Sequence, residues 1–267
     1  MNRFPFSRPL WSALAATALL AGVLALPATA MALGQPHGTS WTAYPPSVPN
    51  SLAYAIVDGR RVTVEVGSVI GKGQLNGNVC EVTTPIQVGG FIPNDATGAP
   101  QSIVWRFTPD CSAIVTSISE FSPGPSPASV CGSPTQQRVM DAQYTIQEQF
   151  GVTATQLDHT YGYDQRCDSV DNPRSIMNKC FTSHFPGWNE PSCSYSLYDA
   201  GLYIQSDHYG EFRNTAFCRF PDPCYTVYYE MHLWTQAASA GFGYNCELTK
   251  GSKPPSWDNR CYVNKVR

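Results

Sequence analysis

The sequence predicts an all-β fold: an antiparallel β-sandwich or barrel made of two β units, stabilised by disulfides and with little helix. Three observations predict it. Short segments alternate between apolar and polar residues and are separated by Gly, Asn, Asp and Pro. Ten cysteines follow an export signal. Charged residues make up only 14% of the chain, against ~25% in most soluble domains, so we expect a surface rich in uncharged polar groups and tyrosine.

Residues 1–32 have the pattern of a signal peptide. Two arginines precede an apolar run at residues 11–26, and small residues then allow cleavage after Ala30 or Ala32. The alternative is an uncleaved membrane anchor, but the run is shorter than the ~20 residues that span a bilayer. We therefore expect a secreted, extracellular protein with no membrane span in the mature chain; the periplasm and the cell surface are further options.

The number and distribution of charged residues limit the kinds of partner that the protein can bind. Removal of the signal changes the formal charge from −3 to −5, because two arginines and no acids leave with it. Proteins that bind nucleic acid need clustered cations, whereas the cations here are scattered singly apart from Arg60 and Arg61. We expect no nucleic-acid partner and no cofactor. The composition permits a neutral partner such as a polysaccharide or a cell-surface glycan, and it does not predict the oligomeric state.

The even number of cysteines predicts five disulfides in an oxidising compartment. The cysteines are Cys80, Cys111, Cys131, Cys167, Cys180, Cys193, Cys218, Cys224, Cys246 and Cys261. The rival interpretation is a metal cluster, but no C-x-x-C occurs, and zinc ligands usually lie ~2–4 residues apart. We therefore predict no metal site. Three local pairings are expected: Cys80 with Cys111, Cys167 with Cys180, and Cys218 with Cys224.

The first half of the mature chain divides into two parts. Residues 33–58 are rich in proline, show no period and predict an extended N-terminal arm. Residues 59–121 predict an N-terminal β unit that begins with the alternating Val62, Val64 and Val66. Further strands are predicted at 78–88, 102–108 and 113–121.

A Ser/Pro/Gly-rich linker at 122–137 precedes a C-terminal disulfide-rich β domain at 138–267. Residues 134–150 fit two patterns, a capped helix with one apolar face or a strand. We favour a strand at 142–149, paired with 154–163, because the surrounding sequence is β.

The clearest alternation lies in residues 224–236. The odd positions, from Tyr225 to Leu233, are apolar and predict a core-facing row. Residues 242–249 repeat the pattern, so the two runs predict a hairpin through Ala-Ser-Ala-Gly. The run 201–209 predicts a further strand.

The even positions of this strand supply the candidate ligand-binding residues: Tyr228, Glu230, His232 and Trp234. Successive members of such a row lie ~7 Å apart on one face. Aromatic rings with polar neighbours are suited to hold sugar rings. Two alternatives remain: the rings merely shield the strand, or Glu230 and His232 form a metal or acid–base pair.

Two further groups are weaker candidates. Asp158, Asp164, Asp168 and Asp171 occupy a loop-like stretch and suit either calcium binding or turn capping. Asp207, His208 and Glu211 are close in sequence and suit acid–base chemistry, or are plain surface residues.

The sequence contains no G-x-S-x-G elbow and no H-E-x-x-H zinc motif, so it assigns no catalytic residue. We expect a secreted, non-enzymatic β protein that binds a glycan or another extracellular surface. Two other functions stay open. One is an extracellular hydrolase that acts on a polymer through paired carboxylates or a metal, and the other is a structural or envelope-associated protein.

Overall fold

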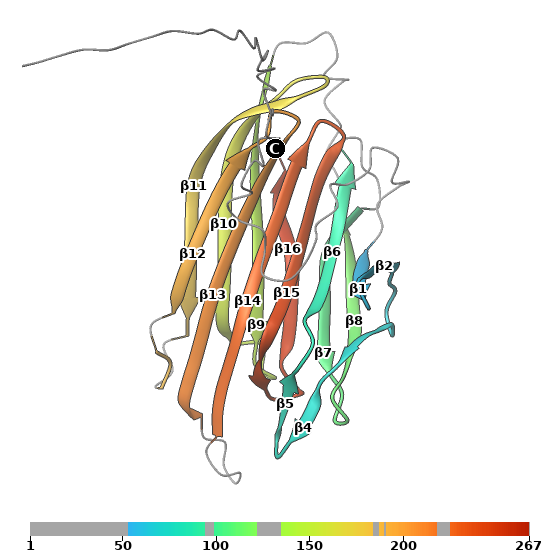
Figure 1. Ribbon diagram of the computed structural model, residues 1–267, viewed down its shortest axis with the longest axis vertical. Helices are drawn as coiled ribbons and strands as arrows, with labels where there is room; N and C mark the ends of the chain where they lie inside the picture. The colour runs from blue at the N-terminus through green and yellow to red at the C-terminus, as the bar shows by residue number, and fades with distance from the viewer. Residues whose placement is uncertain are drawn as a thin grey trace, which may run out of the picture. The chain divides into compact units, whose positions relative to one another are not determined.

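The computed structural model describes residues 53–93, 99–121, 135–183, 187–189, 191–217 and 225–266. Within these ranges the chain forms strands and turns without a helix. The strands make two antiparallel sheets that lie face to face, as Figure 1 shows. The predicted all-β sandwich is thereby confirmed. In the same ranges no helix has the length and apolar character needed to cross a membrane.

Sheet A has the order β12-β13-β14-β15-β6-β1-β2, with β5 paired to β15 and β4 paired to β5. Its strands are β1 (Tyr54–Val57), β2 (Arg60–Thr63), β4 (Gln74–Asn76), β5 (Val79–Val82), β6 (Ile86–Pro93), β12 (Ser192–Asp199), β13 (Tyr203–Phe217), β14 (Tyr225–Ala238) and β15 (Gly241–Lys253).

Sheet B has the order β11-β10-β9-β16-β7-β8-β3. Its strands are β3 (Val69–Lys72), β7 (Ala99–Phe107), β8 (Ser112–Phe121), β9 (Gln136–Gln147), β10 (Thr153–Gln165), β11 (Val170–Thr182) and β16 (Asp258–Val266).

In each sheet, a block of strands from the predicted C-terminal domain lies beside a block of strands from the N-terminal part of the chain. β6 pairs with β15 in sheet A, and β7 pairs with β16 in sheet B. Residues 59–121 and 138–267 thus share one core. The predicted signal peptide, the arm up to residue 52 and most of the linker lie outside the described residues.

The ambiguous segment at 134–150 is a strand. Met140, Ala142, Tyr144 and Ile146 of β9 point into the core, and β9 pairs with β10 as expected. The predicted strand at 78–88 is divided into β5 and β6, because Pro85, between them, has no N–H to donate.

One expectation about strands was wrong, and some strands were not predicted. Of the three alternating valines only Val64 is buried. Val62 is exposed because β2 is a short strand at the edge of sheet A, and Val66 is exposed because β2 ends before it, at Thr63. The sequence also gave no signal for β11 and β12. Both lie at sheet edges, where many polar and exposed side chains replace the alternation of a half-buried strand.

The hairpin of β14 and β15 agrees with its prediction. Its strands pair up to Ala238 and Gly241 around a two-residue turn. The odd positions of β14 face the core, where Tyr229, Met231 and Leu233 are fully buried. This register fixes which residues of β15 lie beside the outward row of β14.

Among the described residues, three disulfides join sheet A to sheet B, one of them through Cys111 in the turn between β7 and β8. Their pairs are Cys80–Cys111, Cys180–Cys193 and Cys246–Cys261. The first confirms its prediction. The pairing of Cys167 with Cys180 was wrong, because Cys180 lies on β11, whose partner across the sandwich edge is β12 with Cys193. Cys167 is itself disulfide-bonded, and Cys131, Cys218 and Cys224 lie outside the described residues.

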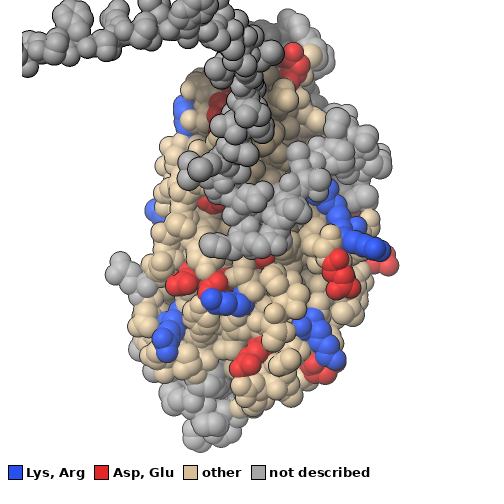
Figure 2. Space-filling view, in the orientation of Figure 1, with Lys and Arg blue, Asp and Glu red and all other residues tan. Residues whose placement is uncertain are grey.

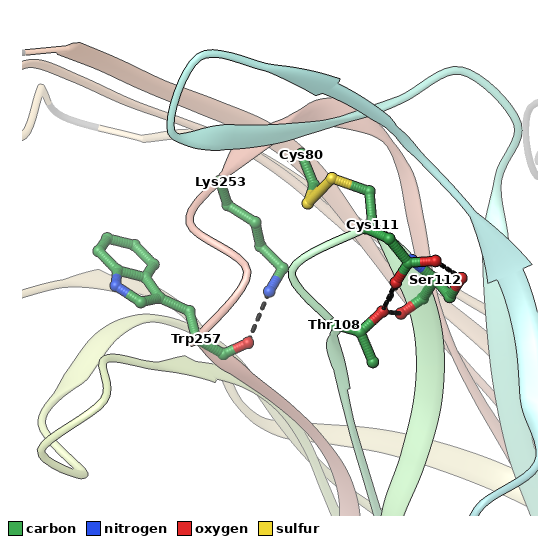
Figure 3. Close-up of a disulfide and its surroundings, with 7 residues drawn as sticks. Cys80, Thr108, Cys111, Ser112, Lys253 and Trp257 are labelled. Carbon is green, nitrogen blue, oxygen red and sulfur yellow. Dashed lines mark hydrogen bonds between the residues drawn. A yellow bond between two sulfur atoms is a disulfide. The ribbon is translucent and has the colours of Figure 1, made fainter.

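A buried lysine lies close to the Cys80–Cys111 disulfide, as Figure 3 shows. The ammonium group of Lys253 donates a hydrogen bond of 2.6 Å to the backbone carbonyl of Trp257. It also lies 5.5 Å from the ring of Trp105 and 5.2 Å from that of Phe107. Burial lowers the pKa of Lys253 to about 7. The charged form of this side chain is therefore less stable in the folded protein than in water.

Candidate functional site

The predicted row of β14 lies on the outward face of sheet A, but most of it is covered. Glu230, His232 and Trp234 are only 6%, 4% and 1% exposed, and Tyr228 is half-buried. The expectation of an exposed aromatic row is therefore wrong at Trp234. β14 is a central strand, so outward side chains of β13 and β15 pack against the row from both sides.

The His232 row is a line of hydrogen-bonded side chains across four strands: Gln205 and Asp207 on β13, His232 on β14, Glu247 on β15 and Gln87 on β6. His232 lies between two carboxylates, with Nε2 3.1 Å from Asp207 and Nδ1 3.4 Å from Glu247. Gln205 donates to Asp207 at 3.0 Å, and Gln87 donates to Glu247 at 3.0 Å.

These carboxylates determine the charge of His232. Burial lowers the pKa of the imidazole, but the hydrogen bonds and charges of Asp207 and Glu247 outweigh burial and raise the pKa to about 9. His232 is therefore an imidazolium at neutral pH, and both of its N–H groups are engaged. An imidazolium held in this way cannot act as a general base, so the His232 row stabilises the sheet.

The tyrosine cluster consists of Tyr209 on β13, Tyr228 and Glu230 on β14, and Lys250 on β15. The Tyr228 and Tyr209 hydroxyls donate to the Glu230 carboxylate, and Lys250 forms an ion pair with it. Thr249 donates to the second carboxylate oxygen at 3.3 Å. A β-bulge at Thr249 places Lys250 directly opposite Glu230.

The electrostatics fix the protonation states in the tyrosine cluster. Burial raises the pKa of Glu230, but hydrogen bonds from Lys250 and both tyrosines bring the pKa below its usual value. Burial and the neighbouring Glu230 raise the pKa of Tyr228 to about 12. At neutral pH the carboxylate is therefore ionised, and both phenols keep their protons and hold fixed orientations.

Both rings of the tyrosine cluster are half-exposed, so the cluster offers aromatic surface that Trp234 does not. Glu211 lies directly opposite Glu230 on the same face and is exposed, as is Lys250. Figure 2 shows the face of sheet A: most of its described surface is uncharged, and the charged groups lie mainly in the lower part and along the right-hand margin.

No protein-family model, curated protein or solved structure matches this chain. The candidate site is therefore argued from its geometry. That geometry consists of two half-exposed rings, a carboxylate that fixes both hydroxyls, and an exposed carboxylate and ammonium at the margin.

The other predicted groups are brought together only in part: Asp164 on β10 lies directly opposite Asp171 on β11. Asp207 and Glu211 face outward, whereas His208 faces the core, because alternate residues of a strand point to opposite faces. Asp158 and Asp164 lie on strand β10, and Asp171 lies on β11. Asp164 bonds to Arg174 at 2.8 Å and Asp171 to Arg166 at 3.2 Å. Because these carboxylates form ion pairs with arginines, their arrangement differs from that of a calcium-binding loop.

Three residues of these two clusters were not predicted as site residues: Tyr209, Glu247 and Lys250. The signal for Glu247 was present, since a two-residue turn at 239–240 pairs His232 with Glu247 once residues are counted back from the hairpin. Lys250 had no such signal, because the bulge at Thr249 shifts the register by one residue.

Proposed function

We propose that this protein is a secreted, non-enzymatic β-sandwich that binds a neutral, hydroxyl-rich polymer such as a glycan at the tyrosine cluster. Disulfides that join the two sheets support export to an oxidising compartment. The low content of charged residues, 14% of the chain, supports a neutral ligand.

One observation carries the proposal: Glu230 holds the hydroxyls of both Tyr209 and Tyr228. The rings are thereby ordered before a ligand arrives, which lowers the entropic cost of binding. Half-exposed rings can contact the C–H face of a sugar, and Glu211 and Lys250 can hydrogen-bond its hydroxyls.

The test is binding of the purified protein to insoluble polysaccharides and to a glycan array. For any glycan that the parent binds, Tyr209→Ala/Tyr228→Ala should weaken the affinity at least ~10-fold, equal to ~1.4 kcal/mol. The matched control is Tyr262→Ala, since Tyr262 is a half-buried tyrosine with a bonded hydroxyl on sheet B. Equal binding by the parent and the double variant, with both folded, would refute the proposal.

The alternative is a hydrolase, and the pair Glu211 and Glu230 favours it, because cross-strand partners place two carboxyl groups on one face. Against it, the oxygens of Glu230 are already engaged by Lys250, Tyr228 and Thr249. Release of reducing ends from a polysaccharide by the parent, lost in Glu211→Gln, would establish the hydrolase and contradict the binder.

A further inference from the structure

A second cluster of reactive groups lies at the other side of sheet A, around the Cys180–Cys193 disulfide. The bond joins β11 of sheet B to β12 of sheet A. Beneath it, Nε2 of His208 lies 3.4 Å from the sulfur of Cys180 and 3.4 Å from that of Cys193. Two sulfur atoms and one imidazole nitrogen therefore converge on one point, and these three atoms lie within 4.8 Å of one another.

The two histidines behind the disulfide have ring nitrogens that are not hydrogen-bonded within the described part of the chain. His208 and His159 are both fully buried, and their rings lie 6.1 Å apart. Nδ1 of His208 and both nitrogens of His159 have no hydrogen-bond partner among the residues that the structure describes. Buried polar atoms are nearly always satisfied, so two such histidines beside a pair of cysteines point to a role beyond packing.

We propose that the Cys180–Cys193 pair is a redox-gated metal site: when a dithiol reduces the disulfide, Cys180, Cys193 and His208 bind Zn²⁺. A Zn²⁺ ion accepts thiolate and imidazole ligands in a tetrahedral arrangement. His159 lies beside these three ligands, and its nitrogens are not committed to a hydrogen bond among the described residues.

The distances suit this ion. Bond lengths of ~2.3 Å to sulfur and ~2.0–2.1 Å to nitrogen place the ligand atoms of a tetrahedral zinc site about 3.6 Å apart for sulfur and nitrogen, and about 3.8 Å apart for two sulfurs. Both sulfur-to-nitrogen distances are 3.4 Å in the oxidised protein. Only the two sulfurs have to separate, and their Cα atoms already lie 6.1 Å apart.

The proposed reaction has two steps, reduction of the disulfide and binding of the metal. The reductant gives two electrons and two protons to the disulfide and becomes a disulfide itself. Zn²⁺ then displaces both thiol protons to solvent. Of the three inter-sheet disulfides whose two cysteines are both described, this one is accessible, because Cys193 is exposed and Cys180 half-buried. Both cysteines of each other pair are 0% exposed.

The experiment uses the full mature chain. Limiting dithiothreitol reduces it, anaerobic desalting removes the reductant, and mass spectrometry of alkylated peptides identifies the reduced pair. We expect Cys180 and Cys193 to be alkylated before the cysteines of the two buried pairs, Cys80–Cys111 and Cys246–Cys261. Titration with Co²⁺ should then give thiolate charge-transfer and tetrahedral d–d absorption that saturates at one equivalent and is bleached by Zn²⁺.

Two variants serve as controls. Cys180→Ser/Cys193→Ser keeps every other cysteine and should show no thiolate band, and His208→Gln should weaken Co²⁺ binding by at least ~10-fold. The proposal is overturned if either buried disulfide opens first or if the band persists in the double variant. It is also overturned if the protein with this pair reduced and both buried pairs intact loses its β-sheet circular dichroism or binds no Co²⁺.

Discussion

Replacement of both Cys246 and Cys261 by alanine is expected to lower the free energy of unfolding by about 2–5 kcal/mol. The bond spans 15 residues of sequence, and closing a loop of that length in the unfolded chain is worth about 3 kcal/mol. Both cysteines are 0% exposed and connect the central strands β15 and β16 through the core. Loss of the bond therefore also leaves a void where the sulfurs packed. Guanidinium chloride unfolding, followed by tryptophan fluorescence, measures the change.

The matched control is Cys180→Ala/Cys193→Ala, whose bond spans 13 residues. The loop entropy is nearly the same in the two variants, but Cys193 is exposed. We expect the buried pair to cost on the order of 1–2 kcal/mol more, because only that pair leaves a cavity. Equal losses in the two double variants would show that burial adds nothing to the Cys246–Cys261 bond.

The faces of the central strands could be predicted from the sequence. Alternation in residues 224–236 separates core from outward side chains, and it holds in β14 because a strand has a strict period of two. Exposure could not be predicted from the same pattern. Trp234 is outward yet 1% exposed, because burial on that face depends on how outward side chains of the neighbouring strands pack, and alternation within β14 carries no information on that packing.

The prediction that Cys167 pairs with Cys180 failed for a related reason. Cys80 and Cys111 are the two cysteines of the predicted N-terminal β unit, so the division into units indicated their pairing. Cys180–Cys193 depends on two edge strands, β11 and β12, that show no alternation and approach each other only when the sheets pack. The candidate site could be predicted only in part. The even row supplied Tyr228 and Glu230, but their partners Tyr209 and Lys250 come from strands β13 and β15.

The contribution of His232 to stability is expected to disappear as the pH rises. Its pKa is about 9 in the folded protein and about 6.5 when unfolded. Because the folded state binds the proton more tightly, the stabilisation is complete below the unfolded pKa and is lost as the pH rises through the folded value. This shift corresponds to about 3 kcal/mol in total, of which about 2 kcal/mol is lost between about pH 7.5 and about pH 10.

The measurement compares the unfolding free energies of the parent and His232→Gln at both pH values. At the lower pH the variant should be less stable by about 3–5 kcal/mol, because the buried carboxylate of Glu247 loses its cationic partner. At the higher pH this difference should shrink by about 2 kcal/mol. Lys253 also titrates in this range, with a pKa of about 7, but it is present in both proteins and its contribution cancels.

A buried histidine that stays neutral throughout provides the control. Burial lowers the pKa of His159 to about 3, so neither its folded nor its unfolded form gains or loses much charge above about pH 7.5. The difference between the parent and His159→Gln should therefore be constant over the range in which that of His232→Gln shrinks. If the His232→Gln difference is constant as well, then His232 is neutral in the folded protein, and the hydrogen bonds to Asp207 and Glu247 do not hold an imidazolium.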